Sequence, residues 1–83
     1  MDKKKYSNEI KSIMASVFNI KKSKIKDDSS PDSIEFWDSL KHMDLILALE
    51  EEFKINFSYE EIGEMINFKI INLILNQKID DKK

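Results

Sequence analysis

Apolar side chains recur at three- and four-residue steps through most of this chain, and this spacing limits the fold more than any other feature. In the first segment, the residues with this spacing are Tyr6, Ile10, Ile13, Met14, Val17 and Phe18. Side chains at these steps share one face of an α-helix. We therefore expect a first long helix with one buried stripe in the segment from Tyr6 to Ile20, and Asn19 can take the left-handed conformation that ends it. Neither strand-like alternation nor an Asn-Gly or Asp-Gly turn is present.

The same spacing predicts a second helix that begins at Asp38 or Ser39 and runs to about Lys54. Its buried stripe is expected to hold Leu45, Leu49 and Phe53, widened by Met43, Ile46 and Leu47. Asp38 is suited to cap this helix, because a short carboxylate accepts a free backbone N–H and its charge favours the positive end of the helix dipole.

Two more helices are expected after a break at residues 56–57. Ser58 and Glu61 have the spacing of a capping box, which predicts a short third helix through Ile62 and Met65. Asn67 is expected to cap a fourth helix. The buried face of that helix is expected to contain Phe68, Ile71, Ile74 and Leu75, and residues 80–83 are expected to fray.

Residues 21–36 lack a sustained period and contain a dense run of turn-forming residues from Asp27 to Ser33. A connection this long needs anchors within a compact domain, and Ile20, Ile25 and Ile34 are the candidates. The predicted fold is all-α: a four-helix bundle of three longer helices and one short third helix, with a long loop between the first and second helices. One domain should span residues 1–83.

Charge is distributed unevenly in this chain of 83 residues, whose net charge is only −2 and which has no cysteine. Residues 1–26 carry eight lysines against two acids, whereas residues 27–64 carry twelve acids against two lysines. An acidic surface repels nucleic acid and favours basic protein partners. No apolar run approaches the roughly 20 residues needed to span a membrane. We expect a monomer in the cytoplasm, bound to neither nucleic acid nor membrane.

The segment Trp37-Asp38-Ser39-Leu40-Lys41 places a serine hydroxyl at the predicted start of the second helix. A phosphate attached there would meet unpaired backbone N–H groups and the positive end of the helix dipole. A serine at this position is more often only a cap, so the position alone does not decide its role.

Asp38-Ser39-Leu40, followed by the acidic and apolar run from Leu45 to Phe53, resembles the acyl carrier proteins. The resemblance implies that Ser39 carries 4′-phosphopantetheine, which a phosphopantetheinyl transferase passes from coenzyme A, and that Asp38 helps to orient this transfer. It also implies a protein that is not an enzyme. Such a protein holds acyl or aminoacyl groups as thioesters, and its partners are acyl-loading and acyl-transfer enzymes.

In the carrier family, the acids and apolar neighbours of this helix form the docking surface for basic patches on partner enzymes. Carried over by position, the candidates here are Leu40, Lys41, Asp44, Leu47, Glu50 and Glu51. Carriers of fatty acid synthesis usually have Gly-Ala or Gly-Ile before the motif and an acid after it. Phe36, Trp37 and Lys41 occupy those positions here, so the resemblance favours a specialised, pathway-specific carrier over the housekeeping one.

Three other interpretations were weighed. An unmodified acidic bundle that binds a basic partner stays open as the alternative. A hydrolase would pair Ser39 with His42, but the chain has no Gly-x-Ser-x-Gly elbow, and His42 is expected at the surface beside the arm. Asp27, Asp28 and Asp32 lack the glycine and the regular spacing of a calcium loop, so no metal site is expected.

Several large apolar residues are expected in the core rather than in a ligand pocket: Met43, Ile46, Ile62, Ile66 and Phe68. Fatty acid carriers open a cleft for the acyl chain between the second and third helices. The sequence leaves open whether this chain does so.

Overall fold

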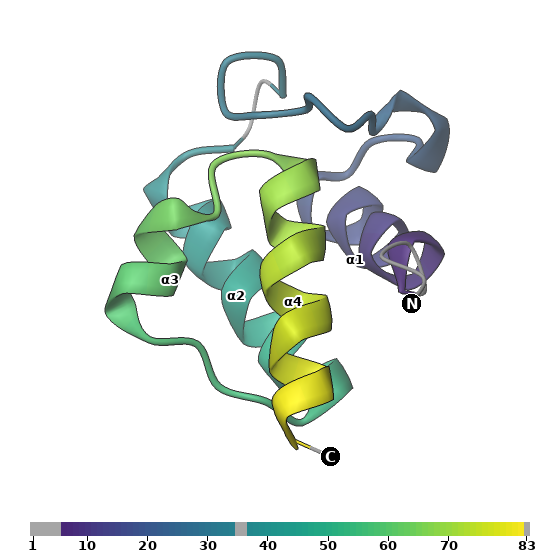
Figure 1. Ribbon diagram of the computed structural model, residues 1–83. Helices are drawn as coiled ribbons and strands as arrows, with labels where there is room; N and C mark the ends of the chain where they lie inside the picture. Colours follow the sequence, from purple (N-terminus) through teal and green to yellow (C-terminus); the bar gives the residue numbers. More distant parts are fainter. Residues whose placement is uncertain (1–5, 35–36, 83) are drawn as a thin grey trace.

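The computed structural model of the chain describes residues 6–34 and 37–82, and the regular structure within them is entirely helical. The elements are α1 (Ser7–Phe18), the single 3₁₀ turn η1 (Lys22–Lys24), α2 (Ser39–Phe53), α3 (Tyr59–Glu64) and α4 (Phe68–Lys82). This arrangement confirms the predicted all-α bundle, with its short third helix and its long connection before α2 (Figure 1). In the part of the chain that is described, no helix is long and apolar enough to cross a membrane.

The helix ends follow the predicted chemistry. Asn19 ends α1 in the left-handed conformation, with φ 55° and ψ 49°. Ser58 and Glu61 form both bonds of the capping box: the Ser58 hydroxyl accepts the Glu61 N–H at 3.1 Å, and the Glu61 carboxylate accepts the Ser58 N–H at 2.8 Å. The Asn67 side chain accepts the Ile70 N–H at 2.8 Å at the start of α4. Local polar residues thus mark the end of α1 and the starts of α3 and α4.

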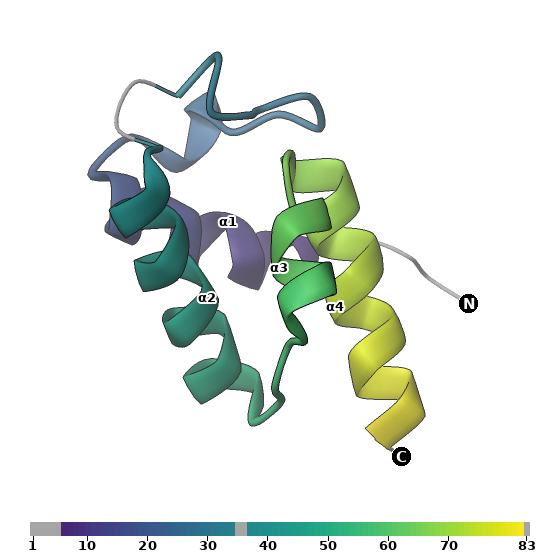
Figure 2. The same ribbon diagram turned by 90° about the vertical axis from the view of Figure 1, so that its left-hand side faces the viewer.

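α2 and α4 start at the same end of the bundle, with the short α3 between them and α1 crossing behind (Figure 2). Three of the helices and the residue after α3 supply a common core of fully buried side chains: Ile10, Met14, Phe18, Leu45, Ile46, Leu49, Met65, Phe68, Ile71 and Leu75. Aromatic contacts join α1 to both ends of α2. Tyr6 meets Phe53 edge-on at 5.5 Å between ring centroids, and Phe18 packs on Trp37 at 5.1 Å.

The long connection is fixed to the start of α4 by its own backbone. The carbonyl oxygens of Ser29 and Asp27 accept the N–H groups of Phe68 and Lys69 at 3.0 and 3.1 Å. The Ser29 hydroxyl is buried and accepts the Lys26 N–H at 2.7 Å. These bonds satisfy donors that a helix start leaves free. They also explain how a loop with few apolar residues stays ordered across the end of the bundle.

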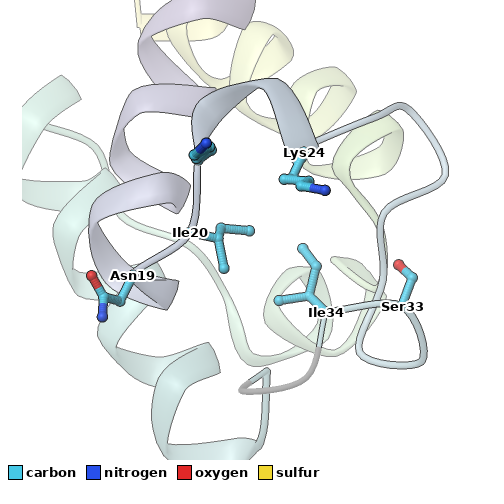
Figure 3. Close-up of a pocket in the computed structure, with 6 residues that line it drawn as sticks. Asn19, Ile20, Lys24, Ser33 and Ile34 are labelled. Carbon is cyan, nitrogen blue, oxygen red and sulfur yellow. The ribbon is translucent and has the colours of Figure 1, made fainter.

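Two of the three predicted apolar anchors of the loop, Ile25 and Ile34, are buried, and the third, Ile20, is half-buried. Figure 3 shows Ile20 and Ile34 turned toward one hollow, with Lys24 and Ser33 at its rim. This hollow, of about 700 Å³, lies between η1 and the following loop and does not include Ser39. Its lining residues belong to the end of α1 and the long connection, so we treat it as part of how the connection packs.

Several sequence predictions of burial were wrong. Met43 and Leu47 are 42% and 58% exposed, because only the side of α2 that carries Leu45, Ile46 and Leu49 faces the core. Ile66, in the connection between α3 and α4, is 56% exposed. The following residues of the expected stripes and core are only half-buried: Tyr6, Ile13, Val17, Phe53, Ile62 and Ile74.

Fraying from residue 80 was also wrong, since α4 continues to Lys82. Near its end Ile79 packs against the core, and Lys78 pairs with Glu61 at 2.9 Å. Phe36 and Lys83, which figured in the sequence predictions, lie outside the described residues.

Candidate functional site

Ser39 is the first residue of α2, and its side chain is exposed. Asp38 precedes it in an extended conformation and caps the helix: its carboxylate accepts the Lys41 N–H at 2.9 Å, and its carbonyl accepts the His42 N–H at 2.8 Å. The predicted cap is therefore confirmed. The serine hydroxyl stands at the end of the helix where backbone N–H groups and the positive end of the dipole point outward.

Trp37 and His42 form a contact beside this serine that joins three elements. The Trp37 indole N–H donates to His42 Nδ1 at 3.0 Å, and the two rings are stacked with centroids 6.0 Å apart. The other ring nitrogen, Nε2, lies 2.9 Å from the backbone oxygen of Ile62 in α3. Trp37 itself is only 4% exposed. We call these three groups, the Trp37 indole, the His42 ring and the Ile62 carbonyl, the His42 clasp.

His42 lies beside Ser39, as expected, but its ring is not free at the surface. It is half-buried, and both ring nitrogens are engaged within the protein. A Ser/His hydrolytic pair needs a free imidazole nitrogen directed at the serine. The His42 clasp uses both nitrogens, so this geometry gives the hydrolase interpretation no support.

An open groove of about 360 Å³ lies next to Ser39, between the start of α2 and the end of α3. Its lining includes Trp37, Ser39, His42, Ile62, Met65 and Ile66. A Cβ placed on Gly63, which also lines it, would meet no atom within 4 Å, so the groove is unobstructed at that point. The wall is mostly apolar, and the exposed hydroxyl stands at its margin.

Four of the six candidate docking residues share the outward face of α2. Leu40, Asp44, Leu47 and Glu51 are spaced by four, three and four residues, and all four are exposed. Leu40 and Leu47, which are 79% and 58% exposed, place two large apolar side chains on this face. We call these four residues the outer face of α2.

The two remaining candidates differ from that group. Lys41 is half-buried and lies off the outer face. The Glu50 carboxylate accepts the backbone N–H of Phe57 at 2.8 Å, so its first role is to hold the connection between α2 and α3. Among the described residues, no group of three or more His, Cys, Asp or Glu side chains is placed to hold a metal ion.

Comparison with known proteins identifies the family. No family model matches the chain, and no curated protein does. Among solved structures, the chain is similar to a holo acyl carrier protein from Geobacter metallireducens, determined by NMR in solution. The two are 30% identical, the match covers 89% of this chain and 85% of the other, and the TM-score is 0.81. This chain belongs to the acyl carrier protein family.

The similarity to this solved structure agrees with the all-helical fold of the chain. The His42 clasp is the part of this carrier's site that sequence reasoning missed. Trp37 directly precedes the cap Asp38, and His42 is the fourth residue of the helix, so the pair has the spacing of a hydrophobic staple. That spacing could have predicted a contact between Trp37 and His42, but a staple usually has two apolar residues and one of these is a histidine.

Proposed function

We propose that this protein is a non-catalytic carrier whose 4′-phosphopantetheine arm is attached to Ser39 and holds acyl or aminoacyl groups as thioesters. The observation that carries the proposal is the position of Ser39: an exposed hydroxyl on the first residue of α2, in an Asp-Ser-Leu motif of a chain in the acyl carrier family. The solved relative is described as a holo carrier.

The residues around Ser39 fit such an arm. The N–H groups of the first turn of α2 and its dipole favour a phosphodiester at the hydroxyl. The groove beside Ser39 offers an apolar wall for the part of the arm near its attachment. The arm supplies the terminal thiol that this cysteine-free chain lacks. Asp38 holds the first turn in place while the Ser39 oxygen, losing its proton to the transferase, bonds to the phosphorus that carries the pantetheine. The pyrophosphate bond of coenzyme A breaks in this step, and adenosine 3′,5′-bisphosphate leaves.

Delivery is proposed to occur through the outer face of α2, which combines Leu40 and Leu47 with the carboxylates of Asp44 and Glu51. Basic patches on the transferase and on acyl-loading and acyl-transfer enzymes would be steered by these charges and would cover the leucines. Exposed ion pairs contribute only about 0 to 1 kcal/mol each, so the charges act mainly on the rate of encounter. We expect the carrier to work as a monomer in the cytoplasm.

We further propose that the carrier serves a dedicated pathway. Lys41 places a cation beside the arm, where fatty acid carriers usually have an acid. An enzyme that reads an acidic patch at that point loses a contact and meets a like charge. The buried Trp37 in the segment before the motif also changes the wall of the groove.

The proposal is tested by incubating the apo-protein with coenzyme A and a broad-specificity phosphopantetheinyl transferase. The intact mass should rise by one arm in the wild type and in Ser16→Ala, a control at another exposed serine, and should stay unchanged in Ser39→Ala. If no transferase modifies the wild type, the carrier proposal fails. Binding of a basic partner protein that persists in Ser39→Ala would instead favour the unmodified interaction module.

A further inference from the structure

Few contacts hold α3 against the rest of the bundle. None of its residues from Tyr59 to Glu64 is buried. The described polar links from this helix to its neighbours are the His42 clasp on the α2 side and the ion pair between Glu61 and Lys78 on the α4 side. Because the ion pair is partly exposed, its contribution is small. Apart from the apolar packing of Ile62 and of the flanking Phe57 and Met65, the clasp is the polar link between α3 and α2 among the described residues.

The hydrogen bonds of the clasp determine the state of its histidine. An indole N–H can only donate, so His42 Nδ1 accepts from Trp37 and carries no proton. In a neutral imidazole the proton is then on Nε2, which donates to the Ile62 oxygen. Trp37 is held in turn by the core, against Phe18 at 5.1 Å. The clasp is thus a continuous chain of bonds from a buried indole to the backbone of α3.

The clasp lies on the boundary between the groove at Ser39 and the core. His42 and Ile62 both line the groove, whereas the buried α2 side chains Leu45, Ile46 and Leu49 are not among its described lining residues. A group attached at Ser39 meets the groove first. A group that passes between α2 and α3 at this wall of the groove has to separate His42 from Ile62.

We propose that the His42 clasp keeps short acyl groups out of the space between α2 and α3, so that this carrier presents them in the open groove beside Ser39. The inference rests on the proposed attachment of the arm to Ser39. Breaking the two bonds of the clasp costs about as much free energy as burying two to four methylene groups recovers. A four-carbon acyl group has three carbons beyond its carbonyl and also brings the polar thioester toward the core, so groups of up to about this size gain too little from burial to open the clasp.

The substrate class that follows is short or polar acyl groups, including aminoacyl groups. Partner enzymes would reach such groups without first drawing them out of the core. A polar group gains even less from the core, because burying it without a partner is unfavourable. Long aliphatic chains are the class that the clasp does not exclude.

The inference is tested with holo-protein loaded from acetyl-, butyryl-, hexanoyl- and octanoyl-coenzyme A by the transferase. The readout is the set of nuclear Overhauser contacts between labelled acyl protons and the methyl groups of Leu45 and Leu49, which are fully buried and are not among the described lining residues of the groove. In the wild type, acetyl and butyryl groups should give no such contacts. In Trp37→Phe and His42→Ala, the shortest chain that gives contacts should be about two carbons shorter or more.

Trp37→Phe provides a second test of the clasp in case His42→Ala does not fold. It keeps an aromatic ring against Phe18 and removes the indole N–H donor. Tyr59→Ala is the matched control, because Tyr59 lies in α3 and is 92% exposed; it should behave as the wild type. Core contacts from the butyryl group in the wild type, or the same shortest chain in wild type and clasp variants, would overturn the inference. A protein that gains no mass with any of the four donors would instead show that the proposed attachment fails.

Discussion

Asp38 and Ser39 are neighbours with different tasks at the start of α2. The Asp38 carboxylate is occupied by the N–H of Lys41, and this bond defines where the helix begins. The Ser39 side chain is exposed and stands next to the groove. The motif therefore joins a structural residue to the proposed attachment residue, and each can be changed without the other.

Asp38→Ala should destabilise the protein by about 1 kcal/mol, because the first turn of α2 loses its side-chain acceptor. The free energy of unfolding in urea measures the effect. Asp38→Asn is the control, since its amide oxygen still accepts the Lys41 N–H and should preserve most of the stability. Equal stabilities for the alanine variant and the wild type would show that the cap contributes nothing.

Glu61 gives the protein a defined response to acid. The backbone N–H of Ser58 is the main cause that lowers the pKa of Glu61 below its ordinary value of 4.5, and Lys78 lowers it further. With a lower pKa in the folded state, the unfolded state binds more protons. The stabilisation is complete above pH 4.5 and is lost as the pH falls through the folded-state pKa.

Glu61→Gln keeps an oxygen for the capping box but removes the charge. It should lower the free energy of unfolding by about 0.5 to 1 kcal/mol at pH 7. The difference from the wild type should shrink when the pH is taken below the ordinary carboxyl value of 4.5. Urea denaturation at several pH values checks this; a difference that does not change with pH would contradict the assigned role of the charge.

At the scale of an element, α2 has two functional sides. Leu45, Ile46 and Leu49 fix it in the core, while the outer face leaves two leucines and two carboxylates in solvent. The proposed arm stands at its first residue. One rigid helix can therefore present both the cargo and the surface that a partner recognises.

Asp44→Lys combined with Glu51→Lys should slow loading by a basic transferase about tenfold at low ionic strength, and salt should reduce the difference. The expected cause is weaker steering, so thermal stability should change little. Glu9→Lys combined with Glu52→Lys makes the same charge change away from the outer face and serves as the control. If both pairs slow loading equally, total charge rather than the outer face is responsible.

Lys41→Glu restores the acid that fatty acid carriers usually have after the motif. It should raise the rate of loading by a transferase of fatty acid synthesis severalfold, because a like-charge contact is removed. Lys22→Glu, a change in η1, controls for net charge. Unchanged or slower loading in Lys41→Glu would contradict the proposal that this lysine selects partners.

The sequence predicted the helices of the whole molecule well, because helical spacing and caps such as Asn19, Asp38 and Ser58 are local signals. It was less successful for features that depend on contacts between residues far apart in the chain. The backbone bonds from Ser29 and Asp27 to the start of α4 join residues about forty positions apart and depend on no side-chain pattern.

The candidate site shows the same division. The places of Ser39 and of the Asp38 cap were local consequences of the motif and were predicted. The role of His42 was not, since it depends on the Ile62 carbonyl twenty residues away. The exposure of Met43 and Ile66 likewise depends on how far α3 covers α2, which apolar spacing alone does not determine.

The proposed function depends on one covalent feature, the arm on Ser39. The mass of the protein isolated from its own cells is the sharpest test of this attachment. Intact mass spectrometry, followed by fragmentation of the peptide that contains Ser39, should find one phosphopantetheine on this serine, free or carrying an acyl group. A protein found entirely unmodified, or modified at another residue, would contradict the account.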